Sequence, residues 1–142
     1  MLEFAAREAD IVGINIKSTP EGGFDWTSIS PAAKARKIGW VREAAGDRFP
    51  ELELHWLVPF VAITNDPEAA ARGFIEAFEA FGAAEESSVA DVLASPQALI
   101  GSEEAVVEMI QRRREEYGVS YMTVFDSAMT TFAPIVARLA GT

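Results

Sequence analysis

Polar side chains that could bind a ligand close the first apolar stretch of the chain, at 11–16. Asn15 lies within its end, and Lys17 and Ser18 follow directly. Asparagine and serine both donate and accept hydrogen bonds, and a lysine ammonium can hold a phosphate or another acid group. The same residue types are common in ordinary loops ahead of a turn. The pattern therefore leaves open a ligand site and simple loop chemistry.

A second group of polar side chains follows the apolar stretch at 119–125. Asp126 and Ser127 could reach a ligand there, although a serine at such a position more commonly caps a turn. Thr64 closes another apolar stretch, but it is better explained as part of the helix start at Asp66. Of these residues, Asp126 is kept as a candidate for cofactor or substrate binding.

The segment at 17–29 reads as a long loop that contains two aromatic residues. Phe24 and Trp26 could form an apolar wall over a bound ring, or they could pack locally beneath the loop, and packing is the favoured interpretation. Gly22-Gly23 is not a phosphate loop, because no GxGxxG or GxxxxGK[ST] pattern surrounds it.

The remaining reactive residues indicate no metal site and no nucleophilic triad. Cysteine is absent, and His55 lies in the middle of a predicted strand with no second ligand candidate near it. Arg112–Arg114 suits the end of a helix, where positive charge favours the dipole. Neighbouring residues on a helix point about 100° apart, so paired acids there do not converge on one atom. The pairs interpreted as solvated surface are Glu85-Glu86, Glu103-Glu104 and Glu115-Glu116.

Strands and helices alternate along the chain. Apolar stretches at 11–16, 51–64 and 119–125 predict strands, and Pro59 predicts a bend in the second of them. A turn is expected before Ser102. The helices are expected at 2–9, 31–45, 67–81, 88–94, 103–117 and 131–140.

Local signals delimit two of these helices clearly. Ser30-Pro31 gives a cap and a proline at the first helical position, and Gly46 ends that helix. Ser102 is the expected cap of the helix at 103–117, and Gly118 is expected to end it. Pro134 is expected to be tolerated only in the first turn of the last helix. The inward face of the helix at 31–45 is predicted to consist of Ala35, Ile38, Val41 and Ala45.

Alternating strands and helices predict an α/β fold with a parallel sheet and right-handed crossovers. Three strands make a small sheet, and helices can cover only one of its faces. The other face must find a partner.

Composition narrows the classes of function. The chain has 142 residues, 49% of them hydrophobic, which suits a single domain at 1–142 with a buried core. Its net charge of −10 repels phosphate backbones, so nucleic acid is a poor partner. Neither a membrane span nor a signal peptide is indicated, so a cytoplasmic protein is expected.

Several segments together resemble the carboxy-terminal part of the luciferase-like oxidoreductases, the family of bacterial luciferase and of enzymes that use coenzyme F420. The likeness keeps the family's order over nearly the whole chain. The matching segments are LEFAAREADIVGI, ISPAAKARKIGWVREAAGDRFPELEL, VAITNDPEAAARGF, SPQALIGSEEAVVEMIQRRREEYGVSYMTVF and FAPIVARLAG.

The resemblance implies a partial (β/α)8 TIM-type barrel with three parallel strands, which would be strands six, seven and eight. It also implies FMN or coenzyme F420 as cofactor, with hydride transfer at its ring. The family's phosphate-binding turn would lie before Leu2, so the resemblance argues against activity of this piece alone. Asn15, Lys17, Ser18 and Asp126 would lie at the rim where such barrels bind cofactor or substrate.

Three hypotheses follow. The chain is the carboxy-terminal segment of a flavin- or deazaflavin-dependent oxidoreductase or monooxygenase, which needs an amino-terminal half-barrel and binds no cofactor by itself. Alternatively, it is a non-catalytic α/β module that pairs its bare sheet face with a second copy of itself. A small-ligand binding domain that uses the loop at 17–29 is the third.

Overall fold

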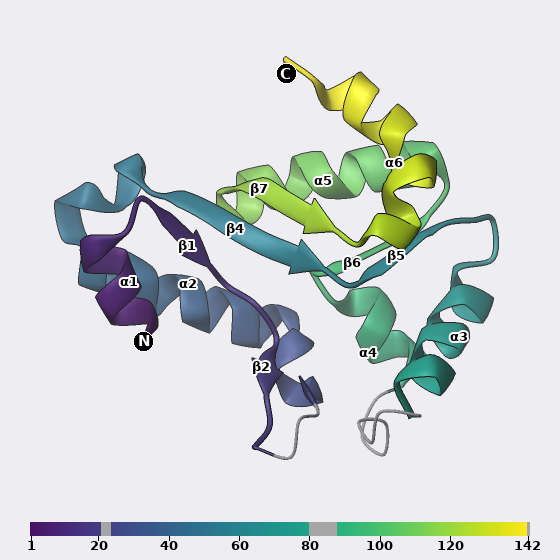
Figure 1. The fold of residues 1–142 in the computed structure, drawn as a ribbon, viewed down its shortest axis with the longest axis horizontal. Coiled ribbons are helices and arrows are strands. Elements are labelled where there is room, and N and C mark those ends of the chain that lie inside the picture. Colours follow the sequence, from purple (N-terminus) through teal and green to yellow (C-terminus); the bar gives the residue numbers. More distant parts are fainter. Residues whose placement is uncertain (21–23, 80–87, 142) are drawn as a thin grey trace.

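The computed structural model describes residues 1–20, 24–79 and 88–141. Helices and strands alternate through them (Figure 1). In chain order the elements are α1 (Leu2–Glu8), β1 (Ile11–Gly13), β2 (Lys17–Ser18), β3 (Phe24–Asp25), the 3-10 helix η1 (Trp26–Ile29), α2 (Pro31–Ala45), the 3-10 helix η2 (Gly46–Glu51), β4 (Glu53–Val58), β5 (Phe60–Ile63), α3 (Pro67–Glu79), α4 (Val89–Ala94), β6 (Ala98–Gly101), α5 (Glu103–Tyr117), β7 (Val119–Val124) and α6 (Asp126–Leu139).

The local signals fix the ends of α2 and α5 as predicted. The Ser30 hydroxyl accepts a hydrogen bond from the Ala33 amide at the start of α2, and the Ser102 hydroxyl does the same for the Ala105 amide at the start of α5. Gly118 ends α5 with φ of 70°, a left-handed conformation that costs a side-chain-bearing residue free energy.

The main sheet has the order β1-β4-β7 and is parallel throughout, which confirms the predicted α/β class and the three parallel strands. Leu54 pairs with Val12 on one side and with Val119 on the other. The predicted bend at Pro59 is also present, because β4 ends before it and β5 begins after it.

A short strand, β6, pairs in parallel with β5, where a turn was expected. The prediction was wrong because all four residues of β6 are buried, so the sequence shows no alternation to reveal a strand. A two-stranded antiparallel pair of β2 and β3 also lies inside the predicted loop at 17–29.

Two expectations about helices are corrected. The last helix begins at Asp126 rather than 131, so Pro134 lies in its interior, where Phe132 and Ile135 anchor the helix in the core. In α2, Ile38 and Val41 face inward as expected, but Ala35 is exposed and Lys34 is buried in its place.

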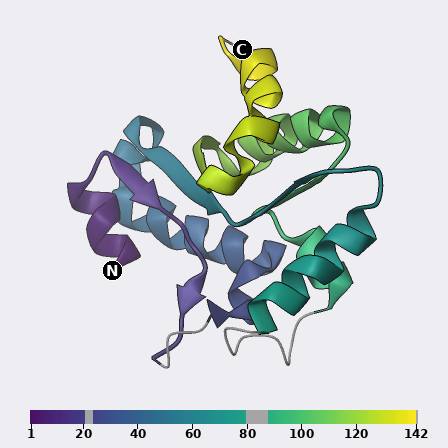
Figure 2. The same cartoon turned by 45° about the vertical axis from the view of Figure 1, so that its right-hand side comes forward.

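The described helices cover one face of the main sheet, and no described helix covers the other. Leu54, Trp56 and Val58 point from β4 toward the helices and are buried. In Figure 1, α2 and α5 lie behind the strands, and Figure 2 shows the same layers turned by 45°. The opposite face is formed by the alternate residues of the three strands, namely Ile11, Glu53, His55, Leu57, Tyr121 and Thr123. We call this set the open face.

Candidate functional site

The carboxyl ends of β1, β4 and β7 meet at one edge of the parallel sheet, and Asn15 lies at this edge. Its side-chain Oδ1 accepts a hydrogen bond of 2.9 Å from the Leu57 amide, so the side chain continues the pairing of β1 with β4 after the strand itself has ended. Its backbone carbonyl accepts 2.7 Å from Lys37 Nζ. Asn15 therefore stabilises this edge of the sheet through hydrogen bonds to β4 and α2.

Gln97 completes the support of the same residue of β4. Its side-chain Nε2 donates a hydrogen bond of 2.7 Å to the Leu57 carbonyl, so the amide and carbonyl of Leu57 are both held by side-chain amides. Sequence reasoning missed Gln97, because a glutamine before an unrecognised strand carries no signal of its own.

Lys17 and Ser18 form β2, which pairs with β3. The Lys17 amide donates to the Ser28 hydroxyl, and its ammonium lies 3.4 Å from the Asp25 carboxylate. The side chain of Lys17 is 69% exposed. The Thr27 hydroxyl, more than Lys17, lowers the pKa of Asp25, so this carboxylate already has several donors.

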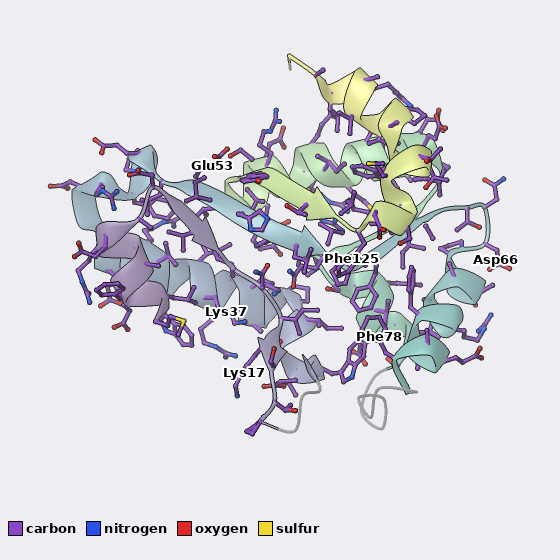
Figure 3. The ribbon with its side chains drawn as sticks, in the orientation of Figure 1. Lys17, Lys37, Glu53, Asp66, Phe78 and Phe125 are labelled. Carbon is purple, nitrogen blue, oxygen red and sulfur yellow. The ribbon has the colours of Figure 1, made fainter. Side chains whose placement is uncertain are left out.

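Lys34 and Lys37 were not predicted as site residues, yet α2 brings both to the end of β1. Lys34 is completely buried, and its Nζ lies 3.5 Å from the Ile14 carbonyl. Burial, with a smaller contribution from Lys37, lowers the pKa of Lys34 to about 7. Burial also lowers the pKa of Lys37. Figure 3 shows Lys17 and Lys37 at the same corner of the molecule.

Asp126 is the first residue of α6, directly after β7. Its carboxylate Oδ1 accepts a hydrogen bond from the Ser127 amide, and its side chain is exposed. It lies at the β7 end of the edge, with β4 between it and the group around β1. The structure thus brings Asn15, Lys17 and Ser18 into one neighbourhood and places Asp126 apart from them.

The open face carries its own polar and aromatic groups. His55 Nε2 lies 2.9 Å from the Thr123 hydroxyl, and its ring lies 4.6 Å from the ring of Tyr121. Among the described residues, no three histidine, cysteine, aspartate or glutamate side chains could share a metal ion. The open face thus carries an aromatic pair and a polar pair that contact each other.

Trp26 packs in the interior, as favoured from the sequence. Its ring stacks on Phe60 at 5.8 Å and meets Phe78 edge-on at 5.7 Å. The side chain of Phe24 lies outside the described part of the chain, as do Gly22-Gly23 and Glu85-Glu86.

Thr64 accepts a hydrogen bond from the Asp66 amide, which confirms its role in the start of a helix. Arg113, by contrast, is not a solvated helix end. It is 6% exposed, and its Nη2 donates 2.6 Å to the Ala98 carbonyl. It thus anchors α5 to β6.

Comparison with known proteins identifies the fold. No protein-family model matches the chain, and no curated protein matches its sequence. The long-chain alkane monooxygenase LadA matches in structure with a TM-score of 0.57 at 16% identity, over 97% of this chain and 38% of that chain. Monooxygenase RslO1 from Streptomyces bottropensis matches with a TM-score of 0.54 at 16% identity, over 96% of this chain and 44% of that chain.

The chain therefore spans less than half the length of either monooxygenase. No helix within its described residues is long and apolar enough to cross a membrane. Its parallel sheet with helices on one face matches part of the TIM-barrel-like fold of these two monooxygenases.

Proposed function

We propose that this chain supplies the carboxy-terminal part of a luciferase-like oxidoreductase or monooxygenase that uses FMN or coenzyme F420. The observation that carries the proposal is the open face. In a closed barrel of parallel strands this face points inward and is covered by the other strands. The match to two monooxygenases over less than half of their length supports the same view.

The residues at the carboxyl ends of the strands suit one side of a flavin-type ring bound at that rim. Asn15 lies after β1, the Thr123 hydroxyl near the end of β7 and the Asp126 carboxylate directly after β7, and each has a group that can form hydrogen bonds. A bound flavin or deazaflavin would supply hydride or electron transfer. The contribution of this chain would be to orient the ring and to exclude water from one side of it.

The partner that we propose is an amino-terminal half-barrel, without which the chain would bind no cofactor and remain inactive. Apolar side chains are exposed in β7 and in the residues that follow it: Tyr121 is 43%, Phe125 47% and Met129 66% exposed. A groove of about 200 Å³ lies between β7, α5 and α6, lined in part by Ile110, Val119, Met122, Phe132 and Val136. Exposed apolar surface of this kind marks a place for protein contact.

The experiment is cofactor titration with and without the partner. The chain is purified alone and after co-expression with the polypeptide encoded immediately upstream of it, and FMN or coenzyme F420 is followed by fluorescence. We expect the complex to bind one of the two cofactors and the chain alone to bind neither. Absence of binding to the complex refutes the proposal.

The same exposed side chains favour self-association as a second candidate function. Two copies would bury them in an isologous dimer. Light scattering tests this, with Met129→Ser as the weakened variant and Arg7→Gln, an exposed change on α1, as the control. A monomer at high concentration in the absence of any partner excludes the dimer and leaves the half-barrel proposal in place.

A further inference from the structure

All the lysines of this chain gather at one place. The sequence contains three of them, Lys17, Lys34 and Lys37, against nine arginines spread along its length. Lys34 Nζ contacts the carbonyl of Ile14, Lys37 Nζ that of Asn15, and Lys17 follows two residues later. The three lysine amines of a chain with a net charge of −10 therefore lie near the carboxyl end of β1.

Negative charge does not balance this group among the described residues. The carboxylate recorded beside it is Asp25, which already accepts hydrogen bonds from the amide and the hydroxyl of Thr27. Arg36 adds a further positive charge near Lys37. Unlike the other described α-helices, α2 has no acidic residue in its first turn. The cluster thus has a local excess of positive charge.

We propose that Lys17 and Lys37, with Lys34 beneath them, bind the phosphate group of a small-molecule ligand. An ammonium has three N–H donors, and Lys17 and Lys37 each direct one at a protein oxygen in the described structure. The remaining donors suit a phosphate, which accepts charge-assisted hydrogen bonds from several sides. The position also fits, since barrels of this type bind ligands at the carboxyl ends of their strands.

This inference deepens the proposed function and rests on it for one point, that the phosphate belongs to a cofactor or substrate of the enzyme. The anion site itself requires only residues of this chain. It can therefore be tested without the partner, separately from cofactor binding.

Binding should also be coupled to proton uptake. Burial, and to a smaller extent Lys37, lower the pKa of Lys34 because both oppose the charge on its amine. A phosphate dianion nearby reverses that balance and favours the protonated amine. Lys37 opposes the charge on Lys34. The charge on Lys37 is in turn favoured by Asp25 and opposed by Lys17 and Arg36.

The test uses the small number of lysines. A chain labelled with ¹³C at the lysine Cε gives one NMR resonance for each of the three, and each reports the protonation of its own amine. Inorganic phosphate and methyl phosphate are titrated at constant ionic strength, with chloride and glutarate as comparison anions. We expect saturable shifts of all three resonances with phosphate and methyl phosphate. The Lys34 resonance should move in the direction that protonation of its amine produces.

Variants separate a binding site from structural capping. Lys37→Gln should weaken phosphate binding about tenfold, as expected for loss of a charge-assisted hydrogen bond, whereas Lys37→Arg should retain most of it and Arg7→Gln all of it. Thermal melts confirm that each variant folds. Shifts of the same size with chloride at the same ionic strength show that the lysines only cap carbonyls, and this result overturns the inference. If phosphate binds here but the complex binds neither FMN nor coenzyme F420, the proposed function fails and this site stands.

Discussion

Replacing Lys34 by methionine should stabilise the folded chain. Lys34 is completely buried, and the nearest acceptor, the Ile14 carbonyl, lies at the long distance of 3.5 Å. Methionine has a similar length and no charge to bury, and it would pack with Ile38 and Val41 on the same face of α2. Little hydrogen-bond energy is lost in exchange.

The magnitude follows from the pKa of Lys34, which burial lowers from 10.5 to about 7. Below pH 7 both the folded and the unfolded chain hold the proton, and the cost of burying the charge is present in full. Between these two pKa values the unfolded chain binds more protons, so the free energy of unfolding rises with pH. This rise is about 5 kcal/mol in total, of which about 2 kcal/mol falls between pH 7 and pH 9.

The assay is urea unfolding followed by tryptophan fluorescence at pH 7 and at pH 9. We expect the difference between wild type and Lys34→Met to shrink by about 2 kcal/mol at the higher pH. Lys17→Met serves as the matched control, because its side chain is 69% exposed. Other groups that titrate in this range are common to all three proteins. Equal stabilisation of Lys34→Met at both pH values would refute the reasoning.

Substitutions at three further positions test what stabilises the edge of the sheet and two of the helices. Asn15→Ala should lower the free energy of unfolding by about 1 kcal/mol through loss of the hydrogen bond from the Leu57 amide. Asn15→Asp keeps the acceptor oxygen and should lose less. Equal losses for the two variants in urea unfolding would contradict this role of Asn15. Gly118→Ala should destabilise by about 1 kcal/mol because φ there is 70°. Gly39→Ala, with open space around it in α2, should instead stabilise, and the two melting temperatures should move in opposite directions.

Much of the fold is predictable because its signals are local. Ser30, Ser102 and Gly118 act through hydrogen bonds and backbone angles within a few residues of themselves, so their sequence context is sufficient. The three parallel strands also followed from their apolar patterning. The strand β6 did not, because four residues buried on both faces look the same in a strand, a helix or a turn.

The candidate site was predictable only in part. Asn15 and Lys17 were identified by their place after an apolar stretch, but the sequence did not show that Lys37 and Gln97 would bind the backbone beside them. Lys34 was not among the residues predicted to face inward from α2, and lysine is almost never fully buried. Its burial depends on the packing of β1 over α2, which no pattern within the helix reveals.

The most direct test of the central claim uses the absence of cysteine from the chain. Thr123 lies exposed on the open face, and Val58 on the covered face of the same sheet. Single variants Thr123→Cys and Val58→Cys are labelled with a bulky maleimide, first alone at low concentration and then with the polypeptide encoded upstream. We predict rapid labelling at position 123 in the chain alone, slow labelling at position 58, and strong protection of position 123 once the partner is added. Slow labelling at position 123 in the isolated monomer, or no protection by the partner, would contradict the account.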